Sequence, residues 1–355
     1  MTKQIIRMKD LKYLAAYTLP ILAWAGMYFQ GVWTFATVMF AFVAIPLLEP
    51  LLGNSAENYE KDVHDERKVR RIFDWLLYIN IPIVYGTVIG LAYCLNTAEL
   101  ATWEIVGLVF SSGIVFGSNG INVAHELGHR RKRSERILSK ILLIPELYAH
   151  FYIEHNRGHH KHVATDKDPA SARLNEWLYT FYFRSLIGSY ISAWKIEMKQ
   201  LSLKKIPFWS WKNEMLRLQL FQALYVIALF VLLPWEVASL VLLSGFIGAL
   251  LLETINYIEH YGLRRKKLES GGYERVRPRH SWNANFEMGR IVLYELTRHS
   301  DHHFIAAKKY QNLDHYEEAP QLPVGYPTSM LMAMVPPLWF AVMNPRIPKE
   351  QLALA

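Results

Sequence analysis

The chain has 355 residues, of which 52% are hydrophobic and only 20% are charged, and its formal net charge is +8. A membrane bundle of this size is normally one unit, so a single domain, residues 1–355, is expected. The single cysteine, Cys94, excludes a disulfide framework and an intrinsic iron–sulfur cluster held by thiolates. Basic loops facing an anionic cytosolic leaflet explain the positive charge, so nucleic acid is not expected as a partner.

Uncharged apolar stretches of about 20 residues mark the expected membrane spans. The first stretch carries no charge from Tyr13 to Leu48, which fits two helices with a turn near Gln30. The last two spans meet at a hairpin around Pro234. The sequence therefore predicts an all-α, polytopic membrane protein with six transmembrane helices near 13–30, 32–52, 75–95, 104–124, 217–235 and 236–258.

Lysine and arginine are unevenly distributed among the loops, and this asymmetry sets the expected orientation. Basic residues precede the first helix and follow helices two, four and six, as in 130–133 and 264–267. The short connections between helices one and two, three and four, and five and six contain no lysine or arginine. We therefore expect both termini and two catalytic segments, 125–216 and 259–355, on the cytosolic side.

Three further apolar stretches do not fit a clean membrane span. The stretches 137–152 and 177–194 contain scattered charges and aromatic residues, which predicts helices in the membrane interface or over the site. The run 328–342 contains Pro336 and Pro337, so a continuous spanning helix is not expected there.

Nine histidines form four clusters, which lie at cytosolic helix ends or in the cytosolic segments. The clusters read HELGH, EHNRGHH, NYIEHYG and RHSDHH. Neutral imidazole is a good ligand for iron, zinc, copper or nickel. Because a catalytic zinc usually takes three protein ligands, nine imidazoles indicate two metal ions. The candidate ligands are His125, His129, His155, His159, His160, His260, His299, His302 and His303.

The spacing within the clusters suits shared metal ligation. His125 and His129 are four residues apart, so they lie on one face of a helix and can share an ion, and His155 and His159 repeat that spacing. His160 is turned by about 100° from its neighbour and is therefore placed to reach a second ion. In the last cluster, His299, His302 and His303 likewise point in two directions, so they can serve two ions. Isolated histidines are expected to be structural: His64, His150, His162, His280 and His315.

Carboxylates beside the clusters are candidates for holding the second N–H of a ligating histidine. They are Glu126, Glu154, Glu259 and Asp301. Asp301, between His299 and His302, is the first choice for this role, and Glu126 is a second candidate. HELGH also matches the H-E-x-x-H motif of zinc proteases, with Glu126 as general base, but that alternative leaves seven clustered histidines unexplained. A metal transporter or sensor is another alternative, although histidines at the cytosolic edge argue against a path through the bilayer.

The motifs together resemble those of the bacterial integral-membrane alkane 1-monooxygenases, within the histidine-box superfamily of membrane fatty-acid desaturases and hydroxylases. HELGH, EHNRGHHKHVAT, NYIEHYGL, HSWN and LTRHSDHH stand in that family's order, and the resemblance extends over most of the chain. It implies terminal hydroxylation of n-alkanes to 1-alkanols by O₂. It also implies a non-haem site of two iron ions, without haem or flavin, held by the nine histidines.

The same resemblance implies that electrons come from a separate rubredoxin, reduced by an NADH-dependent reductase. It places the enzyme in the bacterial inner membrane, where alkanes arrive through the lipid. A related membrane di-iron desaturase or aromatic-methyl hydroxylase is the alternative, and the product separates these activities. Small residues such as Ala41 leave room for an alkane, whereas Gly113 and Gly117 form a pair better suited to helix packing.

Overall fold

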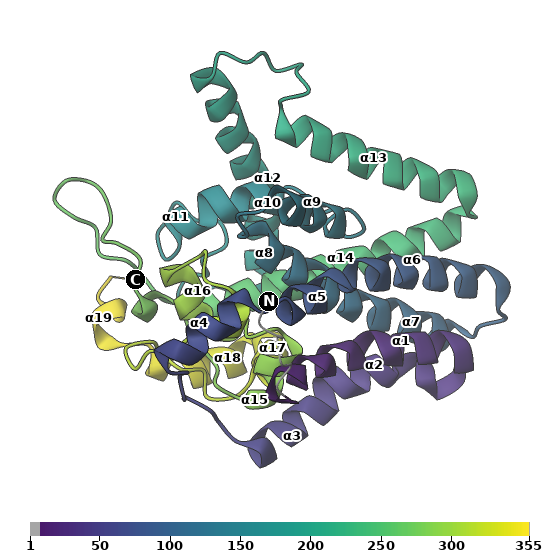
Figure 1. The fold of residues 1–355 in the computed structure, drawn as a ribbon, viewed down its shortest axis with the longest axis horizontal. Helices are drawn as coiled ribbons and strands as arrows, with labels where there is room; N and C mark the ends of the chain where they lie inside the picture. Colours follow the sequence, from purple (N-terminus) through teal and green to yellow (C-terminus); the bar gives the residue numbers. More distant parts are fainter. Residues whose placement is uncertain (1–7, 355) are drawn as a thin grey trace.

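A computed structural model describes residues 8–354, so the extreme ends expected in the cytosol lie outside the described residues. The described chain is helical, and it contains only isolated β-bridges and no strand (Figure 1). This confirms the predicted all-α class. Five helical segments are long and apolar enough to cross a membrane: Gly31–Leu52, Ile72–Thr97, Thr102–Gly128, Glu214–Leu232 and Trp235–His260.

The first expected span, 13–30, is helical but is not one of these five. It consists of η1 (Met8–Tyr17), a 3₁₀ helix, followed by α1 (Thr18–Phe29), which has 12 residues. The α-helical part alone extends about 18 Å, which is shorter than a hydrocarbon core of about 30 Å. The predicted number of six spans is therefore approximate.

Most of the spans are built from several helical pieces in series. Two of them contain π-helical turns, which often occur near functional sites. In chain order the pieces are η2 (Gly31–Phe35), α2 (Ala36–Met39), π-helical η3 (Phe40–Ala44), α3 (Ile45–Leu52), α5 (Ile72–Tyr78), α6 (Asn80–Thr97), α7 (Thr102–Val115), π-helical η4 (Phe116–Ile121), α8 (Asn122–Gly128), α13 (Glu214–Leu232) and α14 (Trp235–His260).

The histidine clusters lie at one end of the membrane-spanning helices. In Figure 1 the connections α1–η2, α6–α7 and α13–α14 all lie toward the right, whereas α8, α11 and α16 lie to the left of them. The basic loops and the histidines are thus at one end of the bundle, opposite the connections that contain no lysine or arginine. Helix α13 stands apart from the rest of the bundle in this view.

The remaining helices surround the histidine end of the bundle. The expected helix at 137–152 ends early, at Leu142, whereas the one expected at 177–194 forms and extends to Leu203. The proline-containing run splits in two, as predicted. These helices are α4 (Lys61–Val69), α9 (Arg133–Leu142), α10 (Phe151–Glu154), π-helical η5 (His155–His159), α11 (His160–His162), α12 (Leu178–Leu203), η6 (Pro278–His280), α15 (Glu287–Val292), α16 (His299–Phe304), η7 (Tyr310–Asn312), α17 (Tyr326–Ala333), α18 (Pro336–Met343), η8 (Asn344–Arg346) and α19 (Lys349–Leu352).

Glycines bring α7 and α14 into close contact. A Cβ on Gly113 would lie 2.6 Å from a side-chain carbon of Ile247, and one on Gly117 would lie 3.3 Å from the carbonyl oxygen of Gly248. This bears out the packing interpretation of the glycine pair. Because α7 continues through η4 into α8, the same contact fixes the histidines of α8 relative to His260 at the end of α14.

Candidate metal centre

Four chain segments bring all nine clustered histidines together. They are α8 with the residue that follows it, the η5–α11 segment, the end of α14, and α16. The histidines form two groups, and within each group the ligand atoms lie within 4.8 Å of one another. The five-histidine group contains His125, His129, His155, His160 and His302. The four-histidine group contains His159, His260, His299 and His303.

The nitrogen atoms within each group have the spacing that a shared metal ion requires. The Nε2 atom of His302 lies 2.8 Å from that of His125 and 3.1 Å from that of His160. In the other group, Nε2 of His303 lies 3.1 Å from Nε2 of His159. Two nitrogens about 2.1 Å from one ion and at right angles to each other are about 3.0 Å apart. Each group therefore fits a bound transition-metal ion.

The expected sharing of an ion by His155 and His159 is wrong. His155 joins His160 in the five-histidine group, with Nε2 atoms 3.1 Å apart, whereas His159 joins the four-histidine group. The reason is local geometry, because residues 155–159 form a π-helical turn. A π-helix bonds residues five apart rather than four, so it aligns His155 with His160.

Burial keeps most of these imidazoles neutral, which is the form that binds metals. Burial and the neighbouring imidazoles hold the pKa of His155 and His160 well below the ordinary value, and they lower that of His129 to about 3. Among residues 8–354, the buried Nε2 of His129 also has no hydrogen-bond partner. A metal ion supplies the partner that such a lone pair lacks.

Two carboxylates contact the four-histidine group directly. An oxygen of Asp168 lies 2.9 Å from Nδ1 of His159, and the same carboxylate accepts hydrogen bonds from Ser171 and from the backbone of Ala170. Burial lowers the pKa of His159, but Asp168 outweighs burial, and the net shift is upward. The second carboxylate, Glu259, lies 3.1 Å from Nε2 of His299. Asp168 was not predicted from the sequence, because nine residues separate it from the histidine it contacts.

Of the carboxylates expected near the clusters, Glu259 contacts a histidine of the site, whereas the two preferred candidates are held elsewhere. Glu126 accepts hydrogen bonds from the Arg130 side chain and from the backbone N–H of Tyr310. Asp301 accepts hydrogen bonds from Lys308 at 2.6 Å and from a backbone N–H of the following loop. Arg130 and Lys308 thus form ion pairs with these two carboxylates, which leaves neither of them to hold a histidine. Glu126 is therefore not positioned like the general base of a zinc protease.

A buried ion cluster anchors the segment that leads into α16. Glu295 contacts Arg290 at 2.6 Å and Lys12 at 3.3 Å, and it accepts a hydrogen bond from Tyr13. Burial raises the pKa of Glu295, but the cations outweigh this effect and lower it to about 2. Its backbone is left-handed, with φ of 60°. This charged anchor fixes the turn four residues before His299.

The isolated histidines lie outside both groups within residues 8–354. His64 pairs with Asp314, and His280 lies 3.3 Å from Glu274. His315 contacts Asn285, and His150 is buried outside the two groups. His162, although two residues from His160, is also outside them.

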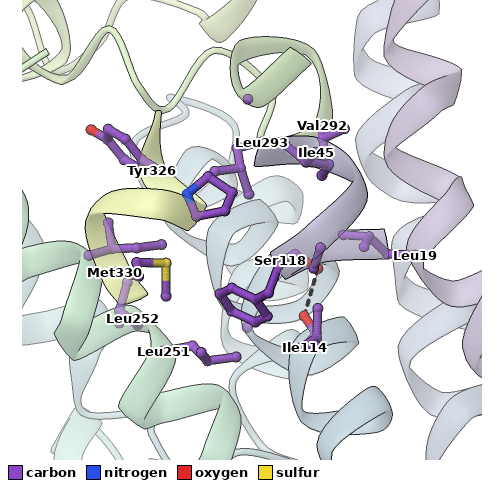
Figure 2. A pocket seen from close by; sticks show the side chains of 16 residues that line it. Leu19, Ile45, Ile114, Ser118, Leu251, Leu252, Val292, Leu293, Tyr326 and Met330 are labelled. Carbon is purple, nitrogen blue, oxygen red and sulfur yellow. Dashed lines mark hydrogen bonds between the residues drawn. The ribbon is translucent and has the colours of Figure 1, made fainter. Parts of the chain in front are cut away.

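A small apolar pocket lies between the spans (Figure 2). Its cavity volume is about 70 Å³, and its walls come from α1, η3, α3, α7, η4, α14, α15 and α17. Ile255 lines it and precedes His260 by five residues on α14, which is about 7.5 Å along a helix axis. Ala41 and Gly117 also line it, whereas Gly113 is packed against α14.

A basic hollow opens on the outer surface beside the five-histidine group. Its volume is about 550 Å³. Arg130, which follows His129 in the chain, lines it together with Lys308, which holds Asp301. Exposed Lys68 and Lys132 add positive charge, and Asp65 and Glu135 also line the hollow.

The fold and the two histidine groups define a class of protein. A model of the fatty acid desaturase family matches residues 101–330, a range that contains all nine histidines of the two groups. The protein is thus a membrane-bound member of the histidine-box superfamily.

Curated relatives narrow this class. Alkane 1-monooxygenase 2 of Pseudomonas aeruginosa is 35% identical over 353 residues, which cover 97% of this chain and 93% of the relative. Alkane 1-monooxygenase of Ectopseudomonas oleovorans is 39% identical over 305 residues, which cover 86% and 76%. The hydroxylase component of xylene/toluene monooxygenase of Pseudomonas putida is 27% identical over an alignment of 356 residues, which covers 94% of this chain and 88% of the relative. The chain belongs to the alkane 1-monooxygenase family.

Proposed function

We propose that this protein hydroxylates the terminal carbon of n-alkanes to give 1-alkanols, using O₂ and two iron ions. The observation that carries the proposal is the pairing of two buried histidine groups with an apolar pocket lined by α14, the helix that ends at His260. Its relatives named alkane 1-monooxygenase support the choice of substrate. We further propose that residues 1–355 act as one catalytic domain, with all nine histidines as iron ligands.

The protein's own contribution is to hold and shield the metal centre. When bound, iron supplies the binding and reduction of dioxygen. The histidines provide neutral nitrogen ligands, and Asp168 fixes the ring of His159 through its Nδ1. The site is dry, because seven of the nine histidines are buried. Water is thereby kept away from a strongly oxidising reaction.

The pocket suits a substrate that has no polar group. An alkane is held only by apolar burial, which contributes roughly 0.8 kcal/mol for each CH₂. Ala41, Ile114 and Leu251 offer such a surface. A narrow pocket admits the chain lengthwise and presents its end carbon, so orientation sets the position of hydroxylation. The surrounding membrane supplies the alkane, since the pocket lies between membrane-spanning helices.

The electron donor in this proposal is a separate rubredoxin that docks at the basic hollow. Charge complementarity favours an acidic partner there, and the hollow adjoins Arg130, next to a histidine of the site. In this proposal the hollow and the site face the cytosol at the bacterial inner membrane, because the basic loops predict that side to be cytosolic.

Charge reversal in the hollow is expected to weaken electron delivery. The double variant Lys68→Glu with Lys132→Glu should raise the KM for rubredoxin roughly tenfold and flatten its dependence on salt, because steering of an acidic donor is lost. Steady-state rates with a purified rubredoxin and reductase measure this effect. The control is Lys266→Glu on the 264–267 segment, outside the hollow. Equal effects of both changes would place the docking face elsewhere.

Product analysis tests the proposed function. Cells that express this chain with a rubredoxin and its reductase are given a series of n-alkanes, and separately toluene or xylene, under oxygen. We expect 1-alkanols, and none from cells that lack the rubredoxin. Alkenes would assign the chain to the desaturases. Benzyl alcohols formed in preference to alkanols would favour the activity named for the xylene/toluene relative.

A further inference from the structure

One residue of the pocket wall reaches both the substrate space and the metal centre. Tyr326 is fully buried at the start of α17, and its ring lines the apolar pocket. Figure 2 shows its hydroxyl turned away from the other pocket residues. A buried tyrosine hydroxyl needs a hydrogen-bond partner, so its direction is informative.

The hydroxyl of Tyr326 leads to the four-histidine group through one carboxylate. It donates a hydrogen bond of 2.7 Å to Oε1 of Glu259. The other oxygen, Oε2, lies 3.1 Å from Nε2 of His299. That nitrogen in turn lies 3.1 Å from Nε2 of His260. An unbroken chain of short contacts therefore connects the pocket wall to the four-histidine group.

Both ends of this chain are held firmly. Glu259 precedes His260 at the end of α14 and is buried. Tyr326 begins α17 with Pro327 in the first turn, which fixes the backbone. Gly325, just before it, lies close to the Glu49 carboxylate, so a Cβ at this position would require that side chain to move. The tyrosine ring can therefore transmit a small displacement rather than absorb it.

The number of histidines also distinguishes the two groups. Catalytic metal sites keep a coordination position open for the reacting molecule, whereas structural sites are closed. An ion held by four histidines has more open positions than one held by five. The group that Tyr326 reaches is thus the one with more room for reactants.

We propose that Tyr326 is a positioning residue that ties occupancy of the alkane pocket to the geometry of the four-histidine group through Glu259. An alkane packed against the ring fixes the hydroxyl, which sets the position of the Glu259 carboxylate beside Nε2 of His299, the nitrogen that faces the other histidines of the group. This inference rests on the proposed function, because it takes the pocket to be the alkane site. It adds a coupling between substrate binding and one of the two metal positions.

Cobalt-substituted protein tests the coupling without turnover. The ligand-field absorption of bound Co²⁺ reports the geometry of the metal sites, and n-octane is the added probe. In the wild-type protein we expect the spectrum to change when n-octane is added. In Tyr326→Phe, which keeps the ring and loses the hydroxyl, this change should disappear while the metal content stays the same. With iron, kcat should fall roughly 10- to 100-fold with little change in the KM for alkane.

A matched control separates this role from general packing. Tyr182→Phe also removes a hydroxyl hydrogen bond to α14, that of Tyr182 to Thr254 at 2.6 Å, but Tyr182 does not line the pocket. It should leave the octane-induced spectral change intact. An identical response of Tyr326→Phe and the wild-type protein would overturn the inference. Absence of any alkanol from the iron-loaded wild-type protein would instead refute the proposed function, and the cobalt spectra would still show whether the link exists.

Discussion

Replacing His303 by alanine is expected to abolish alkanol formation and to lower the metal content from about two ions to about one per chain. His303 belongs to the four-histidine group, where its Nε2 lies 3.1 Å from that of His159. Its loss leaves that ion three histidines and an opening to solvent, whereas the five-histidine group keeps its full set. Elemental analysis of the purified protein and gas chromatography of the products measure the two effects.

A pair of companion variants makes this prediction specific. His302→Ala, at the neighbouring position, should instead weaken the ion of the five-histidine group, so each variant should lose a different ion. Mössbauer spectra of the iron-loaded variants distinguish the two ions. His162→Ala, two residues from a ligand and outside both groups, should retain metal and activity. Loss of the same ion in the two neighbouring variants would contradict the grouping.

The sequence predicted the parts of the fold and site that depend on local pattern. Long uncharged stretches predicted five of the spans, because burial in lipid requires about 20 apolar residues in succession. The first span departs from this rule, since its leading turns are 3₁₀ rather than α-helical. The histidines were predicted as one set because they cluster at helix ends on one side of the expected topology.

Features that depend on tertiary geometry were not predicted from the sequence. The alignment of His155 with His160 depends on a π-helical turn, which regular α-helical spacing does not reveal. The roles of the carboxylates depend on which side chains lie beside them: Lys308 holds Asp301, whereas Asp168 contacts His159. The link through Tyr326 joins segments 67 residues apart in the chain, so only the folded structure reveals it.

Replacing Asp168 by asparagine is expected to weaken metal binding or activity roughly 10- to 100-fold, the usual effect of losing a carboxylate behind a ligating histidine. Asparagine keeps the size and the backbone contact of Asp168, but it removes the charge that holds Nδ1 of His159 at 2.9 Å. The histidine then becomes a poorer ligand and its ring loses its fixed orientation. Competition with a chelator and measurement of kcat test both consequences.

The neighbouring acid provides the control for this change. Asp166 is exposed and lies two residues before Asp168, so Asp166→Asn removes the same charge from the same loop without touching a histidine. It should leave the metal affinity and kcat unchanged. If the two variants behaved alike, the loop charge rather than the contact with His159 would be responsible. If only Asp168→Asn lost metal, one carboxylate that the sequence did not reveal would be needed to hold the four-histidine group in its ligating form.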